Sequence, residues 1–280
     1  MIARRGFSLL ELLLGVALAA VVLSAGTRML LALRRFWTAE RAVLEADDAT
    51  RATLGILSAE LRGTSPVMGD LMRTSDTAVS LRAARGLFVV CRAPTPGAAS
   101  ILVRQDTALA PREPVAGRES VGVFLLGLTP GRDHWVDAAV TSAGTGTCAD
   151  ASPAWRLTLA AAPGAAASLD SAGVGSPVRA FDAVMYRLYD DGSHTWWLGS
   201  RSFASGSWGT TSPLAGPLRA RDGLTLHWTD AAGAAVAADS AVRAVRVTAR
   251  ADVAASEWAP GWRAGPHTDS EVVVVAPRNQ

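Results

Sequence analysis

Glu11 is the residue whose placement most restricts what this chain does, because it is a lone carboxylate near the start of a long apolar run. That run continues from Leu12 to Leu33, and its first twelve residues carry no charge. A helix of about 20 apolar residues spans a bilayer. A carboxylate inside such a helix costs free energy unless a cation neutralises it. The pattern predicts a membrane helix whose Glu11 needs a cationic partner, and an amine from another chain would serve.

The residues directly before the run add a second signal. Arg4 and Arg5 precede Gly6 and Phe7. This stretch resembles the class III signal of type IV pilins and type II secretion pseudopilins. The resemblance implies cleavage by a prepilin peptidase between Gly6 and Phe7, followed by N-methylation of Phe7. It also implies that Glu11 meets the Phe7 amine of a neighbouring subunit when a filament assembles.

Two other interpretations of this N-terminal stretch stay open. A secretory signal peptide also combines a basic start with an apolar core, and residues 17–19 match its small-residue cleavage pattern. That interpretation leaves Glu11 unexplained. A plain signal anchor explains the length and the arginines, but neither the Gly6–Phe7 pair nor Glu11. The arginines predict a cytoplasmic N-terminus and an extracytoplasmic remainder.

Helical periodicity continues past the apolar run. Between residues 34 and 63, apolar residues recur at three- and four-residue steps, with charged residues largely on the other faces. Gly63 and Pro66 end the pattern, because proline cannot continue a helix. An unbroken helix from Phe7 to Arg62 would be about 84 Å long. The stripe expected to pack on the rest of the protein contains Val43, Ala46, Thr50, Leu54, Leu57 and Leu61.

After residue 63 the pattern changes to short β-like runs separated by Gly, Pro and Asp. The clearest unit is a hairpin with strands at 184–189 and 195–198, since the Asp191–Gly192 pair is typical of tight turns. Residues 163–177 and 206–217 indicate loops. The first of these either divides two lobes or is an insertion in one sheet system. Further strands are expected at 78–82, 87–92, 101–105, 121–126, 135–141, 155–159, 224–228, 242–249 and 271–276.

The downstream order adds a weaker likeness. Tyr186-Arg187-Leu188, the Trp-Leu pair at 197–198 and the alternating strand 242–247 resemble larger minor pilins of the PilW type and J-type pseudopilins. The fold class expected is α+β and pilin-like. Its long helix spans a membrane in its first half, is amphipathic in its second half, and packs on a mainly antiparallel β-rich domain. The expected divisions are a leader at 1–6, a membrane or filament-core helix at 7–33, its amphipathic continuation at 34–63, and an extracytoplasmic domain at 64–280.

The balance of basic and acidic residues limits which partners the chain is expected to bind. All 27 basic residues are arginines, and losing Arg4 and Arg5 with the leader would leave 25 of them against 25 acidic residues. A formally neutral chain lacks the basic surface that binding to a phosphate backbone requires. We therefore expect no nucleic-acid partner. The expected partners are a prepilin peptidase, other pilin or pseudopilin subunits, and the inner membrane.

Cys91 and Cys148 are the two cysteines of the chain. In an oxidising compartment they are candidates for a disulfide, with two separate buried thiols as the alternative. With four scattered histidines they form no metal-ligand spacing. Asp190 and Asp191 suit a plain turn better than a calcium loop, which needs more oxygen ligands in fixed register.

Catalytic motifs are not evident. Gly144 to Ala149 fits a dinucleotide fingerprint only superficially, because a loop and then a strand are expected there rather than a helix. We expect no enzyme activity, cofactor or metal. The sequence predicts a structural minor pilin or pseudopilin in the bacterial inner membrane, moving into a pilus or pseudopilus on assembly. The alternative is a membrane-anchored binding protein or adhesin that joins no filament. An extracytoplasmic enzyme has no supporting constellation.

Overall fold

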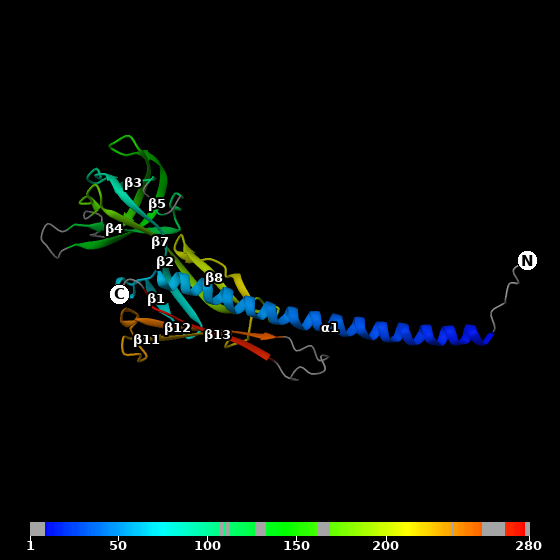
Figure 1. The fold of residues 1–280 in the computed structure, drawn as a ribbon. Helices are drawn as coiled ribbons and strands as arrows, with labels where there is room; N and C mark the ends of the chain where they lie inside the picture. The colour runs from blue at the N-terminus through cyan, green and yellow to red at the C-terminus, as the bar shows by residue number, and fades with distance from the viewer. Residues whose placement is uncertain are drawn as a thin grey trace, which may run out of the picture.

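The structure is a computed structural model that describes residues 9–106, 109, 112–126, 133–161, 169–236, 238–253 and 267–277. One long helix, α1 (Leu9–Arg62), leads into a β-rich part in which the strand pairs are antiparallel. Figure 1 shows α1 projecting far from the β-rich part, with the N-terminus at its free end. The expected α+β class is confirmed.

The strands pair in two sheets, one of ten strands and one of three. Two short 3-10 helices, η1 (Pro66–Met68) and η2 (Asp239–Ala241), lie among them. The first sheet contains β1 (Leu71–Thr74), β2 (Ala78–Arg92), β3 (Ser100–Arg104), β4 (Glu119–Leu125), β5 (His134–Thr147), β6 (Pro153–Ala161), β7 (Pro177–Asp190), β8 (Trp196–Ala204), β9 (Ser207–Trp208) and β10 (Ser212–Leu218). The second contains β11 (Leu224–Thr229), β12 (Ala244–Val253) and β13 (His267–Val275).

Six strands of the large sheet close into a ring, which we call the barrel lobe. β2 pairs with β3, and the pairing then runs through β6, β5, β4 and β7 back to β2. The inward side chains alternate along each strand, as a two-residue period requires. They form one apolar core that includes Phe88, Ile101, Val123, Leu125 and Leu157.

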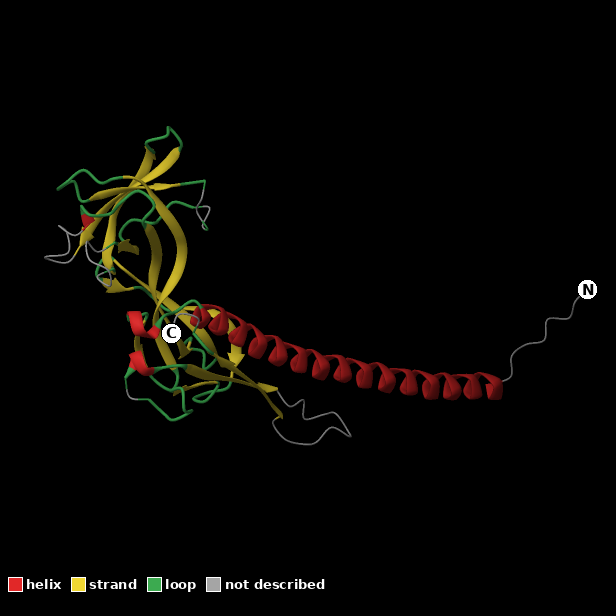
Figure 2. Cartoon of the chain, turned by 60° about the vertical axis from the view of Figure 1, so that its left-hand side comes forward, coloured by secondary structure: helices red, strands yellow, loops and turns green. Residues whose placement is uncertain are grey.

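The second core lies where α1 meets the sheets, and we call this part the helix lobe. The last turns of α1 contact β10, β12 and β13. Figures 1 and 2 show the end of the helix lying beside the three-stranded sheet. The expected stripe is confirmed, with Val43 packed at its margin: the buried α1 side chains are Ala46, Ala49, Thr50, Thr53, Leu54, Leu57 and Leu61.

β2 and β7 connect the two lobes because each runs through both. β2 pairs with β7 from Ala78 to Val89, and a register shift lies between Ala84 and Gly86. The boundary between the cores crosses these strands and does not lie at the loop near 163–177. The described residues Leu169 and Ala172 of that loop are buried in the barrel core.

Local sequence patterns predict the hairpin correctly, but they predict one stretch wrongly. The hairpin is confirmed: β7 pairs with β8 and the chain reverses after Asp190. The expected loop at 206–217 is wrong, because most of it belongs to β9 and β10. β10 contains two prolines and is an edge strand, where proline is tolerated. It is held by the buried side chains of Ala215 and Leu218.

Candidate functional site

The free half of α1 is the first candidate site. Gly6 and Phe7 lie outside the described residues, which begin at Leu9. Glu11 lies in the first helical turn, where the helix dipole favours a carboxylate. Every residue from 9 to 38 is exposed. The large apolar side chains there include Leu9 at 78% and Leu23 at 70% exposure.

This exposed apolar surface has the dimensions of a membrane span. Among the described residues, α1 is the one helix long and apolar enough to cross a bilayer. From Leu9 to Thr27 it rises about 28 Å at 1.5 Å per residue, close to the roughly 30 Å of the hydrocarbon core. Arg28 then lies at the far margin, with its side chain long enough to reach the headgroup region. Such a helix is compatible with a single-pass anchor.

A disulfide joins Cys91, at the end of β2, to Cys148, which follows β5. The two Cα atoms are 5.3 Å apart, within the range that a bridge requires. Both residues are buried, and Ala154 and Leu102 pack beside them. The bridge therefore fastens the end of the barrel lobe. Gly144 to Thr147, expected as a loop, are the end of β5, and a strand follows the turn.

The Asp190–Asp191 pair forms the hairpin turn. Asp190 Oδ1 accepts a hydrogen bond from the Gly192 N–H at 2.8 Å, and Asp191 Oδ1 accepts one from the Ser193 N–H at 2.8 Å. Asp191 Oδ2 accepts a third from the Trp197 indole at 3.0 Å. The Ser193 hydroxyl and N–H, with the Trp197 indole, lower the pKa of Asp191 to about 2. Among the described residues, no three His, Cys, Asp or Glu side chains converge as a metal site.

Charged side chains that the sequence did not single out meet at the junction of the two lobes. The Arg85 guanidinium contacts Glu60 of α1 at 3.0 Å and Asp182 of β7 at 3.3 Å. Arg118 adds a second contact to Asp182 at 2.8 Å. The Tyr186 hydroxyl donates to Glu60 at 3.0 Å. Burial, followed by the charge of Glu60, raises the pKa of Tyr186 to about 12.

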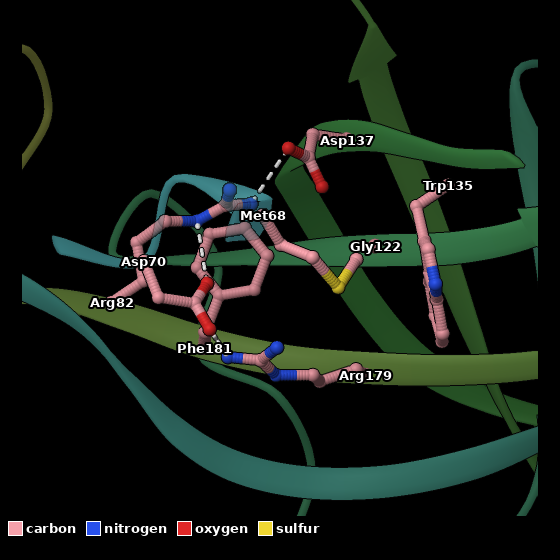
Figure 3. Close-up of a pocket in the computed structure, with 8 residues that line it drawn as sticks. All are labelled: Met68, Asp70, Arg82, Gly122, Trp135, Asp137, Arg179 and Phe181. Carbon is pink, nitrogen blue, oxygen red and sulfur yellow. Dashed lines mark hydrogen bonds and ion pairs between the residues drawn. The ribbon is translucent and has the colours of Figure 1, made fainter. Parts of the chain in front are cut away.

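A small pocket opens on the outer face of the barrel lobe, beside this junction (Figure 3). We call it the outer-face pocket, and its cavity volume is about 30 Å³. Gly122, Asp137 and Arg179 lie opposite one another on β4, β5 and β7, so they share this face. The lining residues are Met68, Asp70, Arg82, Gly122, Trp135, Asp137, Arg179 and Phe181.

Ion pairs fix the polar wall of the pocket. Arg82 contacts Asp137 at 2.7 Å, and its guanidinium lies 3.7 Å from the ring centroid of Phe181. Arg179 contacts the buried Asp70 at 2.6 Å. Asp70 also accepts a hydrogen bond from the Ser65 N–H at 2.7 Å, which ties the pocket to the loop that follows α1.

Gly122 is the sequence signal that could have revealed the pocket. It interrupts an apolar strand between Val121 and Val123, and an isolated glycine in a strand often marks a close approach. A Cβ atom at Gly122 would lie 3.1 Å from Asp137 Oδ1 and 3.3 Å from Trp135 Cε3. No local pattern indicates that Met68 or Arg179 reaches the same place, because their strands and loops are far apart in sequence.

Comparisons of the chain with protein-family models, curated proteins and solved structures find no match.

Proposed function

We propose that this chain is a structural subunit of a pilin-like filament, either a minor pilin or a pseudopilin. The observation that carries the proposal is the free half of α1, an exposed apolar helix with Glu11 in its first turn. Apolar patches of this size on a soluble surface mark contact with lipid or with other proteins. The length of the helix suits both a bilayer and a helical filament core.

Glu11 makes the helix less stable in the lipid than in a filament. A carboxylate at the edge of the hydrocarbon region is unfavourable there. An ion pair with an amine is much stronger in a low dielectric than in water. After cleavage between Gly6 and Phe7, the new amino group of a neighbouring subunit supplies that cation. The pairing favours assembly over lateral diffusion as single anchored chains.

The proposed subunit has a defined orientation in the membrane. Arg4 and Arg5 hold the leader on the cytoplasmic side before cleavage, so both lobes lie outside the inner membrane. The Cys91–Cys148 bridge suits that oxidising side. The amphipathic end of α1 then holds the lobes at the surface of the membrane or filament.

Replacing Glu11 tests the assembly role. We expect Glu11→Ala to insert into the membrane and to be cleaved, but to be absent from the filament fraction. Glu45→Ala is the matched control, because Glu45 lies on the same helix in an exposed pair with Arg41 and should assemble normally. Incorporation of Glu11→Ala at the wild-type level would contradict the proposal.

The anchored binding protein stays as a second candidate, because the outer-face pocket gives the barrel lobe a place for a ligand. The two functions differ in their partners. A filament subunit co-purifies with other pilin-like chains after mild cross-linking, whereas a solitary anchored receptor does not.

A further inference from the structure

The charge, size and aromatic wall of the outer-face pocket restrict what it can hold. We propose that the pocket binds a neutral hexopyranose sugar. Its hydroxymethyl group enters between Asp137 and Arg179, and its ring lies on Trp135. The proposal is separate from the filament role, because it uses no residue of α1.

The charges of the pocket balance one another. Its two aspartates and two arginines are joined in a chain of contacts, from Asp137 through Arg82 and Asp70 to Arg179. A charged ligand would compete with these contacts and leave a partly buried group without its partner, which is unfavourable. A neutral polar ligand leaves all of them intact.

Hydrogen-bonding capacity remains on both sides of the opening. Among the described residues, Asp137 Oδ1 accepts no hydrogen bond, and Arg179 uses one side-chain nitrogen, toward Asp70. A carboxylate accepts and a guanidinium donates, whereas a hydroxyl does both. A hydroxyl between Asp137 and Arg179 therefore satisfies both side chains. Gly122 lies between them on the intervening strand, and its lack of a side chain lets Asp137 and Trp135 approach the backbone there.

Trp135 supplies the apolar wall. Its ring packs on Phe124 with centroids 5.2 Å apart, and Figure 3 shows the ring edge-on beside Gly122, with the Met68 side chain extending toward it. Large aromatic faces with a few well-placed polar groups are typical of small-ligand sites. The apolar C–H face of a pyranose ring matches such a surface, while its hydroxyl groups match the charged side.

The cavity volume limits how much of the ligand enters. A water-sized group occupies about 10 to 15 Å³ by this measure, so about 30 Å³ accepts about two non-hydrogen atoms. A hydroxymethyl group has that size. The ring itself stays at the mouth, against Trp135. Because the barrel lobe lies at the opposite end of the molecule from the free half of α1 (Figure 1), a membrane or filament around α1 leaves the mouth accessible.

The test titrates methyl glycosides of glucose, galactose and mannose into the full chain labelled with ¹⁵N-tryptophan. A zwitterionic detergent is required, because maltoside and glucoside detergents present the ligand themselves. The indole signal of Trp135 is assigned by its loss in Trp135→Phe. Gly122→Ala adds a Cβ at the pocket floor, and its close contacts are with side-chain atoms of Asp137 and Trp135, which must shift by a few tenths of an ångström. Gly144→Ala is the control, because a Cβ there meets nothing within 4 Å.

We expect at least one hexoside to shift the Trp135 signal saturably, with a dissociation constant of about 1 mM. Its affinity should not change with salt, because the ligand carries no charge. Gly122→Ala should weaken binding about tenfold or more, and Gly144→Ala should bind as the wild type does. If no hexoside shifts the Trp135 signal, or if Gly122→Ala binds as tightly as the wild type, the proposal is wrong. Neither result bears on filament assembly.

Discussion

Arg85 Nη1 lies 3.0 Å from Glu60 Oε1, and this contact joins the end of α1 to the strand that enters the barrel lobe. The same guanidinium reaches Asp182, whose side chain is 1% exposed. The two lobes share β2 and β7, and this ion pair adds a side-chain connection where those strands cross between the cores. These charges therefore connect the end of α1 to the two strands that the lobes share.

Removing that cation should destabilise the fold. Arg85→Met leaves Glu60 without its cation and Asp182 with only Arg118, so we expect a loss of about 3 kcal/mol in the free energy of unfolding. Chemical denaturation of the full chain in detergent measures it. Arg41→Met removes an exposed Arg–Glu pair on the same helix and should cost no more than about 0.5 kcal/mol. Equal effects from the two variants would rule out a structural role for the junction.

Tyr186 should make stability fall at alkaline pH. Its pKa is raised to about 12 in the folded chain, above the value of about 10 expected when unfolded. The unfolded chain therefore loses the phenol proton first, and the contribution is present below pH 10 and lost as pH rises toward 12. Comparing the pH dependence of denaturation in wild type and Tyr186→Phe isolates the effect. Parallel curves across this window would show that the hydroxyl is not protected.

The disulfide should stabilise the barrel lobe. Its two cysteines are separated by 57 residues, and closing a loop of that size contributes about 4 kcal/mol in the chain-entropy model. We expect reductant, or the double substitution Cys91→Ser with Cys148→Ser, to lower the melting temperature. Thiol labelling of the unreduced, denatured protein should find no reactive cysteine. Two labelled cysteines would show that the bridge does not form in the cell.

The two faces of the amphipathic half of α1 should respond differently to substitution. Leu57 is fully buried, whereas Leu44 is 58% exposed. Leu57→Ala should cost about 3 kcal/mol of folding stability, and Leu44→Ala less than about 0.5 kcal/mol. Denaturation of the purified variants compares them directly. A large effect of Leu44→Ala in the isolated chain would mean that the lobes cover more of the helix than the structure shows.

Local signals predict the elements better than their connections. The end of α1 at Arg62 and the turn after Asp190 follow from proline, glycine and aspartate chemistry. The sequence predicts two strands where β2 is one, because Gly86 interrupts the pattern at a register shift. The start of β7 escapes prediction because a proline opens it and Asp182 lies within it. Ion pairs from distant segments make that buried charge acceptable.

Of the candidate sites, one can be predicted from local sequence and the other cannot. Glu11 can be identified from the sequence alone, because a single charged residue stands out in an apolar run. The outer-face pocket cannot, since Trp135 and Arg179 meet only when the barrel closes. β4 pairs with the next strand, β5, but its pairing with β7 joins segments far apart in the chain. Residue spacing alone does not contain that information.

Mass spectrometry of the N-terminus of the protein taken from cells tests the central claim most directly. The proposed function requires a mature chain that begins at Phe7 and carries a methyl group on its amino nitrogen. Gly6 replaced by a bulky residue should leave the precursor uncut, which gives the matched comparison. A chain that begins at Met1, or at a residue beyond Ala19, would contradict the account, because Glu11 would then have no Phe7 amine to meet.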